Sequence, residues 1–194
     1  MRRIAIILTL ALCLVVTDRA HGQRALKGMR GIEVRGGMVD GFYASAARDH
    51  TGYYFGLAMA TYAKNANKWV WGAEVLNRNY PYKETRIPAT QFTAEGGYYY
   101  NFLADYSKTA LFNIGGSVLS GYEMVNKGER TLSDGSTLMN RGRFLYGGAI
   151  TLEVDVYLTN SLALMLSARE RILWGTTTGH FHTQFGVGLR FMIN

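Results

Sequence analysis

Apolar side chains recur at almost every second position along two long stretches in the C-terminal half of the chain. Residues 144–158 carry mostly Phe, Tyr, Ile, Leu and Val on one face and mostly Gly, Ala, Thr, Glu and Asp on the other, and residues 181–193 repeat the alternation. A period of two belongs to β-strands, whose successive side chains point to opposite faces. Strands of soluble domains usually run about 3–10 residues. The longer stretches found here suit tilted membrane strands.

Eight segments of this kind follow one another along the chain. They lie at about 30–39, 52–63, 68–80, 90–104, 109–125, 144–158, 162–174 and 181–193. Tight turns rich in Asn, Asp and Ser connect them at 65–67, 105–108 and 159–161, alternating with long connections at 40–51, 81–89 and 126–143 and an intermediate one at 175–180. Bacterial outer-membrane barrels have such short turns at one rim and long loops at the other. The sequence therefore predicts an all-β fold, an eight-stranded antiparallel up-and-down transmembrane β-barrel.

Aromatic residues gather near the ends of these segments, whereas the middles are richer in Leu, Val, Ile, Ala and Gly. Near the short-turn end they are Tyr62, Trp69, Trp71, Tyr100, Phe102 and Phe112. Near the long-loop end they are Phe55, Tyr80, Tyr82, Phe92, Tyr122, Phe144, Tyr146, Trp174 and Phe181. Two aromatic belts around an aliphatic band are typical of a barrel whose outer surface meets lipid headgroups at both rims.

The N-terminal segment has the features of an export signal. Two arginines precede an apolar run over residues 4–16, and Ala20-His21-Gly22 supplies small residues on either side of the histidine, before a cut at Gln23. The run is too short for a membrane-spanning helix, which needs about 20 residues. We therefore predict a cleavable signal peptide over residues 1–22 and a single mature domain over residues 23–194.

Alternation alone does not tell which face is inside, because a soluble lipocalin-like barrel would show the same pattern inverted. The polar face carries acidic and basic residues in mid-strand, namely Glu33, Arg35, Glu74, Glu95, Glu123, Glu153, Asp155, Arg169, Arg171 and Arg190. Glycines such as Gly97 and Gly147 lie among them, and an exposed strand surface has little use for so much glycine. The lumen of an eight-stranded barrel has room only for side chains, and Arg pairs well with carboxylates there.

We therefore expect these ten charged residues to form a salt-bridged network that plugs the lumen. The sixth and seventh segments are joined by a tight turn near Asn160, so Glu153 and Asp155 should face residues 165–169 across the hairpin. Glu153 and Arg169 are close enough in this arrangement for a double-mutant cycle to test whether they meet.

Few residues suggest catalysis or ligand binding. His180 and His182 lie at the long-loop end of the last segment, but Ser167, the nearest serine on the polar face, lies deeper in mid-strand than a Ser-His-acid mechanism requires. Two histidines without a third ligand make a poor zinc site, and the only cysteine, Cys13, lies within the expected signal. Adjacent glycines, as at 96–97 and 147–148, lack the following Lys-Ser/Thr of a phosphate-binding loop. The basic residues are scattered rather than clustered as in a nucleic-acid-binding surface. We predict no enzymatic activity, cofactor or metal, and expect neither nucleic acid nor a small-molecule substrate as a partner.

Three stretches of the sequence resemble the TraO family of Bacteroides-type conjugative transposons. They are RALKGMRGIEVRGGMVDGFY, YNFLADYSKTALFNIGGSVLSGYE and GHFHTQFGVGLRFMIN, and the similarity extends over essentially the whole mature chain. The resemblance implies a protein of conjugative transfer, encoded among the components of a type IV-like secretion apparatus, and it brings no catalytic residues. The last stretch also resembles the C-terminal assembly signal of outer-membrane barrels, although it ends in Met192-Ile193-Asn194 where that signal has an aromatic residue.

We therefore interpret the chain as a structural or interaction component of a conjugative DNA-transfer apparatus in the cell outer membrane. Its expected partners are outer-membrane lipid and other proteins of the apparatus. The connection at 126–143 is the longest and most charged, which makes it the best candidate for a contact surface. Two alternatives stay open at this point: a barrel enzyme acting on lipid or peptide, and a soluble periplasmic barrel that binds a ligand.

Overall fold

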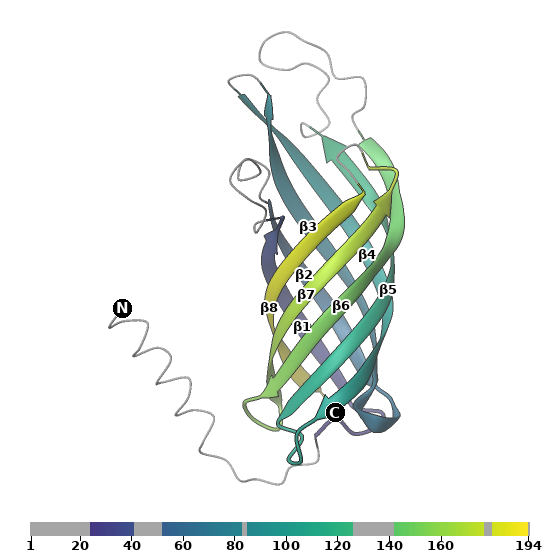
Figure 1. Ribbon diagram of the computed structural model, residues 1–194, viewed down its shortest axis with the longest axis vertical. Coiled ribbons are helices and arrows are strands. Elements are labelled where there is room, and N and C mark those ends of the chain that lie inside the picture. The colour runs from purple at the N-terminus through teal and green to yellow at the C-terminus, as the bar shows by residue number, and fades with distance from the viewer. Residues whose placement is uncertain (1–23, 41–51, 83–84, 126–141, 177–179, 194) are drawn as a thin grey trace, which may run out of the picture.

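The computed structural model describes residues 24–40, 52–82, 85–125, 142–176 and 180–193, which form a closed barrel (Figure 1). Its elements are β1 (Arg30–Val39), β2 (Gly52–Tyr62), the 3₁₀ turn η2 (Lys64–Ala66), β3 (Lys68–Tyr82), β4 (Thr85–Ala104), β5 (Ala110–Val125), β6 (Gly142–Tyr157), β7 (Leu162–Trp174) and β8 (Phe181–Ile193). Neighbouring strands pair antiparallel in chain order, and β8 pairs with β1 to close the sheet. The predicted eight-stranded up-and-down barrel is confirmed.

The strand ends joined by the tight turns and the strand ends that flank the long connections lie at opposite ends of the barrel (Figure 1). The β2–β3, β4–β5 and β6–β7 turns share one end with the start of β1 and the end of β8, and we call this end the short-turn rim. Backbone hydrogen bonds close these turns, for example from Asp105 N–H to the Ala110 carbonyl at 3.0 Å and from Leu158 N–H to the Leu162 carbonyl at 2.9 Å. We call the opposite end the long-loop rim; the connections at 41–51 and 126–141 lie outside the described residues.

The predicted long connection at 81–89 is wrong, because both flanking strands continue into it. β3 runs to Tyr82 and β4 begins at Thr85. Two prolines and several charged residues suggested a loop, since proline cannot donate to a sheet ladder. The hairpin, however, extends past its neighbours: the described part of β2 begins opposite Arg78, and that of β5 ends opposite Ala89. Beyond those points neither strand pairs on its outer side with another described residue, so a proline nitrogen that faces that side interrupts no described pairing.

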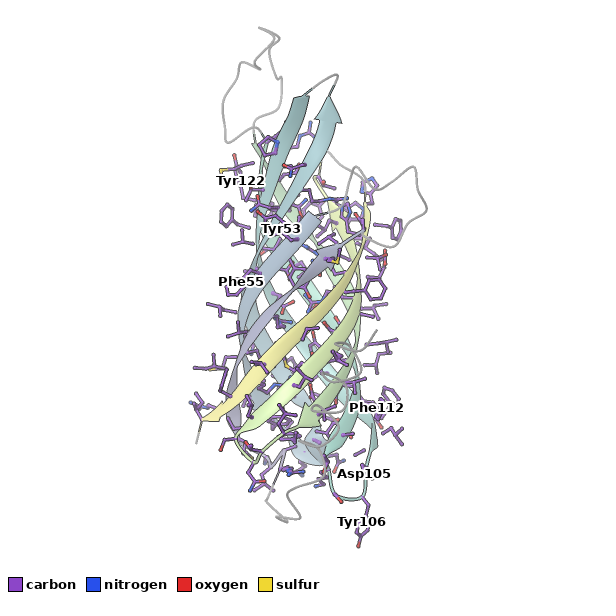
Figure 2. All side chains as sticks on the ribbon, turned by 90° about the vertical axis from the view of Figure 1, so that its left-hand side faces the viewer. Tyr53, Phe55, Asp105, Tyr106, Phe112 and Tyr122 are labelled. Carbon is purple, nitrogen blue, oxygen red and sulfur yellow. The ribbon has the colours of Figure 1, made fainter. Side chains whose placement is uncertain are left out.

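The outer surface of the barrel is apolar. Large aliphatic side chains stand exposed around its middle, among them Ile32, Leu57, Ile114, Val118, Ile150, Leu152, Leu166 and Val187. Val118 is 72 % exposed and Ile150 is 60 % exposed. A continuous apolar surface of this kind would be unfavourable in contact with water. Figure 2 shows Tyr53, Phe55 and Tyr122 pointing outward toward the long-loop rim and Phe112 lying near the short-turn rim. The apolar face is therefore the outer one, as in a membrane barrel.

Glycines let large inward side chains lie across the narrow lumen. A Cβ on Gly115 of β5 would lie 2.5 Å from the ring of Tyr99, its partner on β4. A Cβ on Gly186 of β8 would clash with the hydroxyl of Tyr54. Because both tyrosines are buried, these two positions admit only glycine without displacement of a ring.

The predicted signal peptide over residues 1–22, with its cut before Gln23, lies outside the described residues. Within the described part of the chain, no helix is long and apolar enough to cross a membrane.

Candidate functional site: the charged barrel interior

The interior of the barrel is lined by charged side chains. All ten residues singled out from the sequence are buried there: Glu33, Arg35, Glu74, Glu95, Glu123, Glu153, Asp155, Arg169, Arg171 and Arg190. Their strands place them because buried and exposed positions alternate, as in the central part of β5. Charges taken out of water need opposite partners, and the structure supplies these in layers along the barrel axis.

The layer nearest the short-turn rim is centred on Arg190 of β8, which has no exposed surface. Its guanidinium donates to Glu33 Oε1 at 2.7 Å, to Asp155 Oδ2 at 2.7 Å and to Glu153 Oε1 at 3.0 Å. It also donates to the hydroxyl of Tyr62 at 2.9 Å. One arginine thereby contacts carboxylates from β1 and β6. We call Glu33, Lys68, Glu153, Asp155 and Arg190 the inner cluster.

Lys68 is the member of the inner cluster that the sequence analysis missed. Its ammonium group is fully buried, contacts Glu153 and lies 2.7 Å from Asp155 Oδ2. The residue begins β3, directly after the β2–β3 turn, and so was not counted among mid-strand charges. A signal was present, because Lys68 is in phase with the inward Glu74 of the same strand.

A second layer, the middle cluster, consists of Arg35, Glu74, Glu95, Arg169 and Arg171. Arg35 pairs with Glu95, and Arg169 lies 2.8 Å from Glu95 and 3.7 Å from Glu74. Arg171 contacts Glu74 at 3.0 Å. The two clusters are joined along β1, where Arg35 Nε lies 3.7 Å from Glu33 Oε2.

Glu153 and Asp155 face Ser167 and Met165 of β7, within the range expected from the sequence, but Glu153 does not pair with Arg169. Glu153 lies opposite Ser167 and Arg169 opposite Thr151, so the two are diagonal neighbours on the β6–β7 hairpin. Glu153 instead reaches β3 and β8 across the lumen, and the Arg169 Nε–H donates to Thr151 Oγ1 at 3.0 Å. In a barrel this narrow, side chains from non-adjacent strands meet at the axis as easily as those along a hairpin.

A third group lies toward the long-loop rim. Arg78 of β3 pairs with Asp40, which follows β1, and His182 Nδ1 lies 2.8 Å from an Arg78 nitrogen and 3.2 Å from Asp40 Oδ2. Gln91 donates to Glu123 at 2.7 Å. His182 was noted from the sequence but its neighbours were not, because Asp40 and Arg78 are 38 residues apart along the chain.

The histidines considered for catalysis have structural contacts. His180 Nδ1 lies 2.9 Å from the Leu173 carbonyl oxygen, and His182 belongs to the group with Asp40 and Arg78. Ser167 lies opposite Gly186, deeper in the barrel than His182 on the same strand pair. Among the described residues there is no group of three or more His, Cys, Asp or Glu side chains that could hold a metal ion.

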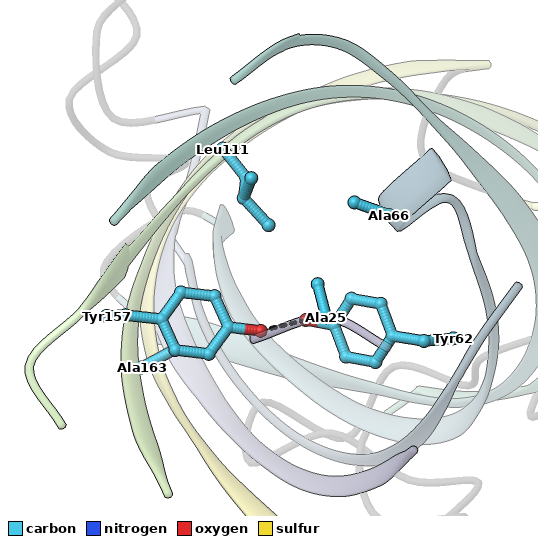
Figure 3. Packing of buried hydrophobic residues seen from close by; sticks show 6 residues of the cluster. All are labelled: Ala25, Tyr62, Ala66, Leu111, Tyr157 and Ala163. Carbon is cyan, nitrogen blue, oxygen red and sulfur yellow. Dashed lines mark hydrogen bonds between the residues drawn. The ribbon is translucent and has the colours of Figure 1, made fainter. Parts of the chain in front are cut away.

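At the short-turn rim the lumen ends in a small apolar cluster. The hydroxyls of Tyr62 and Tyr157 hydrogen-bond across the opening at 2.9 Å, with Leu111 and Ala163 beside them (Figure 3). The Arg190 guanidinium carbon lies 5.8 Å from the Tyr62 ring centre, so the tyrosines connect this cluster to the inner cluster. Charged and polar side chains therefore lie inside the barrel at every level between the Arg78–Asp40 group and this cluster.

Comparison with known proteins gives a family and a fold. The family described as conjugative transposon protein TraO matches residues 26–193. Neisserial surface protein A is similar in structure, with a TM-score of 0.57 and 13 % identity over 85 % of this chain and 97 % of that one. Ail, the attachment invasion locus protein of Yersinia pestis, has a TM-score of 0.53 and 10 % identity over 87 % of this chain and 100 % of that one. No curated protein matches the sequence.

Proposed function

The chain belongs to the TraO family of conjugative transposon proteins, and from this we propose that it is a structural, non-catalytic component of the DNA-transfer apparatus at the outer membrane. The observation that carries the proposal is the match of the family over residues 26–193, which is nearly the whole described chain. A component of this kind anchors or contacts other proteins of the apparatus. Its chemistry is then recognition rather than catalysis.

Placement in the outer membrane is supported by the outer surface of the barrel. The apolar band and the aromatic side chains near its rims match the hydrocarbon layer and the headgroup regions of a bilayer. The signal peptide expected over residues 1–22 would bring the chain to that membrane, with the mature protein beginning at Gln23.

The charged interior is proposed to be a structural plug rather than an ion path. Arg190 and Lys68 each contact two or more carboxylates and have no exposed surface. Side chains so placed brace β1, β3, β6 and β8 against one another. A braced, filled barrel suits an anchor, and leaves the rims as the surfaces that meet partners. The connection at 126–143 remains the proposed contact on the long-loop side.

Deletion of the gene from a donor strain should abolish transfer of the mobile element. We expect transfer frequency to fall to the assay background, while cleavage of DNA at the origin of transfer continues, because the proposed role lies at the envelope and not in DNA processing. The wild-type gene and the conservative Leu152→Ile variant should restore transfer. Transfer at the wild-type frequency from the deletion strain, or loss of cleavage at the origin, would contradict the proposed role.

A further inference from the structure

Six residues before β1 lie across the short-turn rim, and we call residues 24–29 the strap. Arg24 and Ala25 are 6 % and 4 % exposed, although they belong to no strand and lie at the rim. Leu26 and Lys27, next along the chain, are exposed. The strap therefore turns its first two residues inward and its middle outward.

Arg24 fastens the strap to several elements of the rim. Its Nη1 donates to Thr109 Oγ1 at 2.7 Å, just before β5, and its Nε donates to Asn160 Oδ1 at 3.3 Å, in the β6–β7 turn. The guanidinium carbon lies 5.7 Å from the centre of the Tyr157 ring at the end of β6. One side chain thus bridges two of the three short turns and touches the edge of the lumen.

Ala25 fills the opening itself. It packs in the apolar cluster with Tyr62, Leu111 and Tyr157, and Figure 3 shows it lying within the ring of strands beside the hydrogen-bonded tyrosines. Its φ of 53° is a left-handed conformation that alanine rarely adopts. Such a strained conformation persists only where the surrounding structure holds the residue in place, and here the rim of the barrel does so.

The strap is fixed to β2 at its C-terminal end, where the Gly28 N–H donates to the Tyr62 carbonyl at 2.9 Å and the Tyr62 N–H donates to the Met29 carbonyl at 2.8 Å. The β1–β8 ladder that closes the sheet begins at Arg30, after the strap. The contacts that the structure shows for Arg24 are to neutral groups, whereas Arg190 in the lumen contacts three carboxylates. A hydrogen bond from a guanidinium to a neutral oxygen lacks the attraction of a second, opposite charge and is weaker than one to a carboxylate. The part of the strap before Gly28, which includes Arg24 and Ala25, is accordingly held less firmly than the lumen network and is the part that can leave the rim.

From these contacts we propose that the strap is a releasable closure of the short-turn rim, with Arg24 as its latch. When it is seated, Ala25 covers the tyrosine pair and the apolar cluster around it. When it leaves, that cluster opens to solvent while the inner cluster keeps the lumen filled. A protein arriving at this rim would meet either the strap or the opened cluster, so the strap determines which surface the rim presents.

Cysteine labelling can test this closure, because the only native cysteine, Cys13, lies in the expected signal peptide and is replaced by serine wherever that segment is retained. One reporter is Ala66→Cys, since Ala66 is 5 % exposed and packs in the same cluster as Ala25. A second reporter is Ser117→Cys, deep in the lumen. Each reporter is combined with Arg24→Ala or with Lys27→Ala, a matched control that removes an exposed cation from the same strap. The folded full chain in liposomes is treated with a water-soluble maleimide.

We expect Ala66→Cys to react slowly with the strap intact and about tenfold or more faster with Arg24→Ala, because two hydrogen bonds and a cation–π contact are lost. Lys27→Ala should leave the rate unchanged, and Ser117→Cys should stay protected throughout. The proposal is overturned by fast labelling of Ala66→Cys with the strap intact, by equal rates in the Arg24 and Lys27 variants, or by exposure of Ser117→Cys. Failure of Arg24→Ala to form a barrel would also overturn it, since the strap would then be part of the fold.

Discussion

The Arg190→Met variant should lose roughly 3–5 kcal/mol of unfolding free energy, the usual effect of removing one partner from a buried ion-pair network. Arg190 is fully buried and donates to Glu33, Glu153 and Asp155. Methionine fills a similar volume without charge, so the three carboxylates would share only Lys68 as a buried cation of the inner cluster. Urea unfolding of the protein in lipid vesicles measures the difference.

Arg30→Met provides the matched control. Arg30 begins β1 at the short-turn rim and is exposed, so its loss should change the unfolding free energy by less than about 0.5 kcal/mol. If the Arg190→Met variant were as stable as the Arg30→Met variant, the inner cluster would contribute little to the stability of the barrel.

A double-mutant cycle between Glu153 and Lys68 should show coupling, and this coupling energy should exceed that between Glu153 and Arg169.

Leu152→Arg should destabilise the barrel by roughly 2–4 kcal/mol, as expected for a cation placed on the lipid face near the bilayer midplane. Leu152 is 54 % exposed on the outer face of β6, between the aromatic side chains of that strand's long-loop end and the short-turn rim. Its neighbours Thr151 and Glu153 are buried in the lumen. The same unfolding assay in vesicles applies.

The depth of the substitution supplies the control for this second variant. Ile193 also faces outward but lies at the short-turn end of β8, where the cost of arginine falls to about 0–1 kcal/mol. Equal stability of the Leu152→Arg and Ile193→Arg variants would mean that no hydrocarbon layer surrounds the barrel at Leu152.

How the strands are joined was predicted from the alternating lengths of the turns, and the inward face from its charged residues and glycines; the period of two predicted the strands themselves. It worked best where long runs alternate without interruption, as in β6 and β8. It failed at 81–89, because proline is excluded only from strands that are paired on both sides. The described parts of β2 and β5 do not extend as far as the tip of the β3–β4 hairpin. Alternation along a strand shows which face each side chain occupies, but not how far a hairpin extends beyond its neighbours.

Partner choice inside the barrel was beyond the reach of the sequence. The alternation along each strand placed Glu153 and Arg169 in the lumen, but it does not give the direction in which a side chain crosses the lumen. A partner for Glu153 was therefore sought on the adjacent strand, whereas its partners are Lys68 and Arg190. The strap was missed for another reason. Nothing in the sequence around Ala25 indicates a left-handed residue, because its conformation is imposed by packing against the rim.

Membrane fractionation tests the central claim, that this barrel turns its apolar face to the lipid of the outer membrane. On a density gradient the protein should sediment with the outer membrane, and the unheated sample should migrate differently on a gel from the boiled one, because the closed barrel withstands detergent until it is heated. Recovery as a soluble monomer without detergent, migrating identically before and after boiling, would contradict the account and favour a soluble periplasmic barrel.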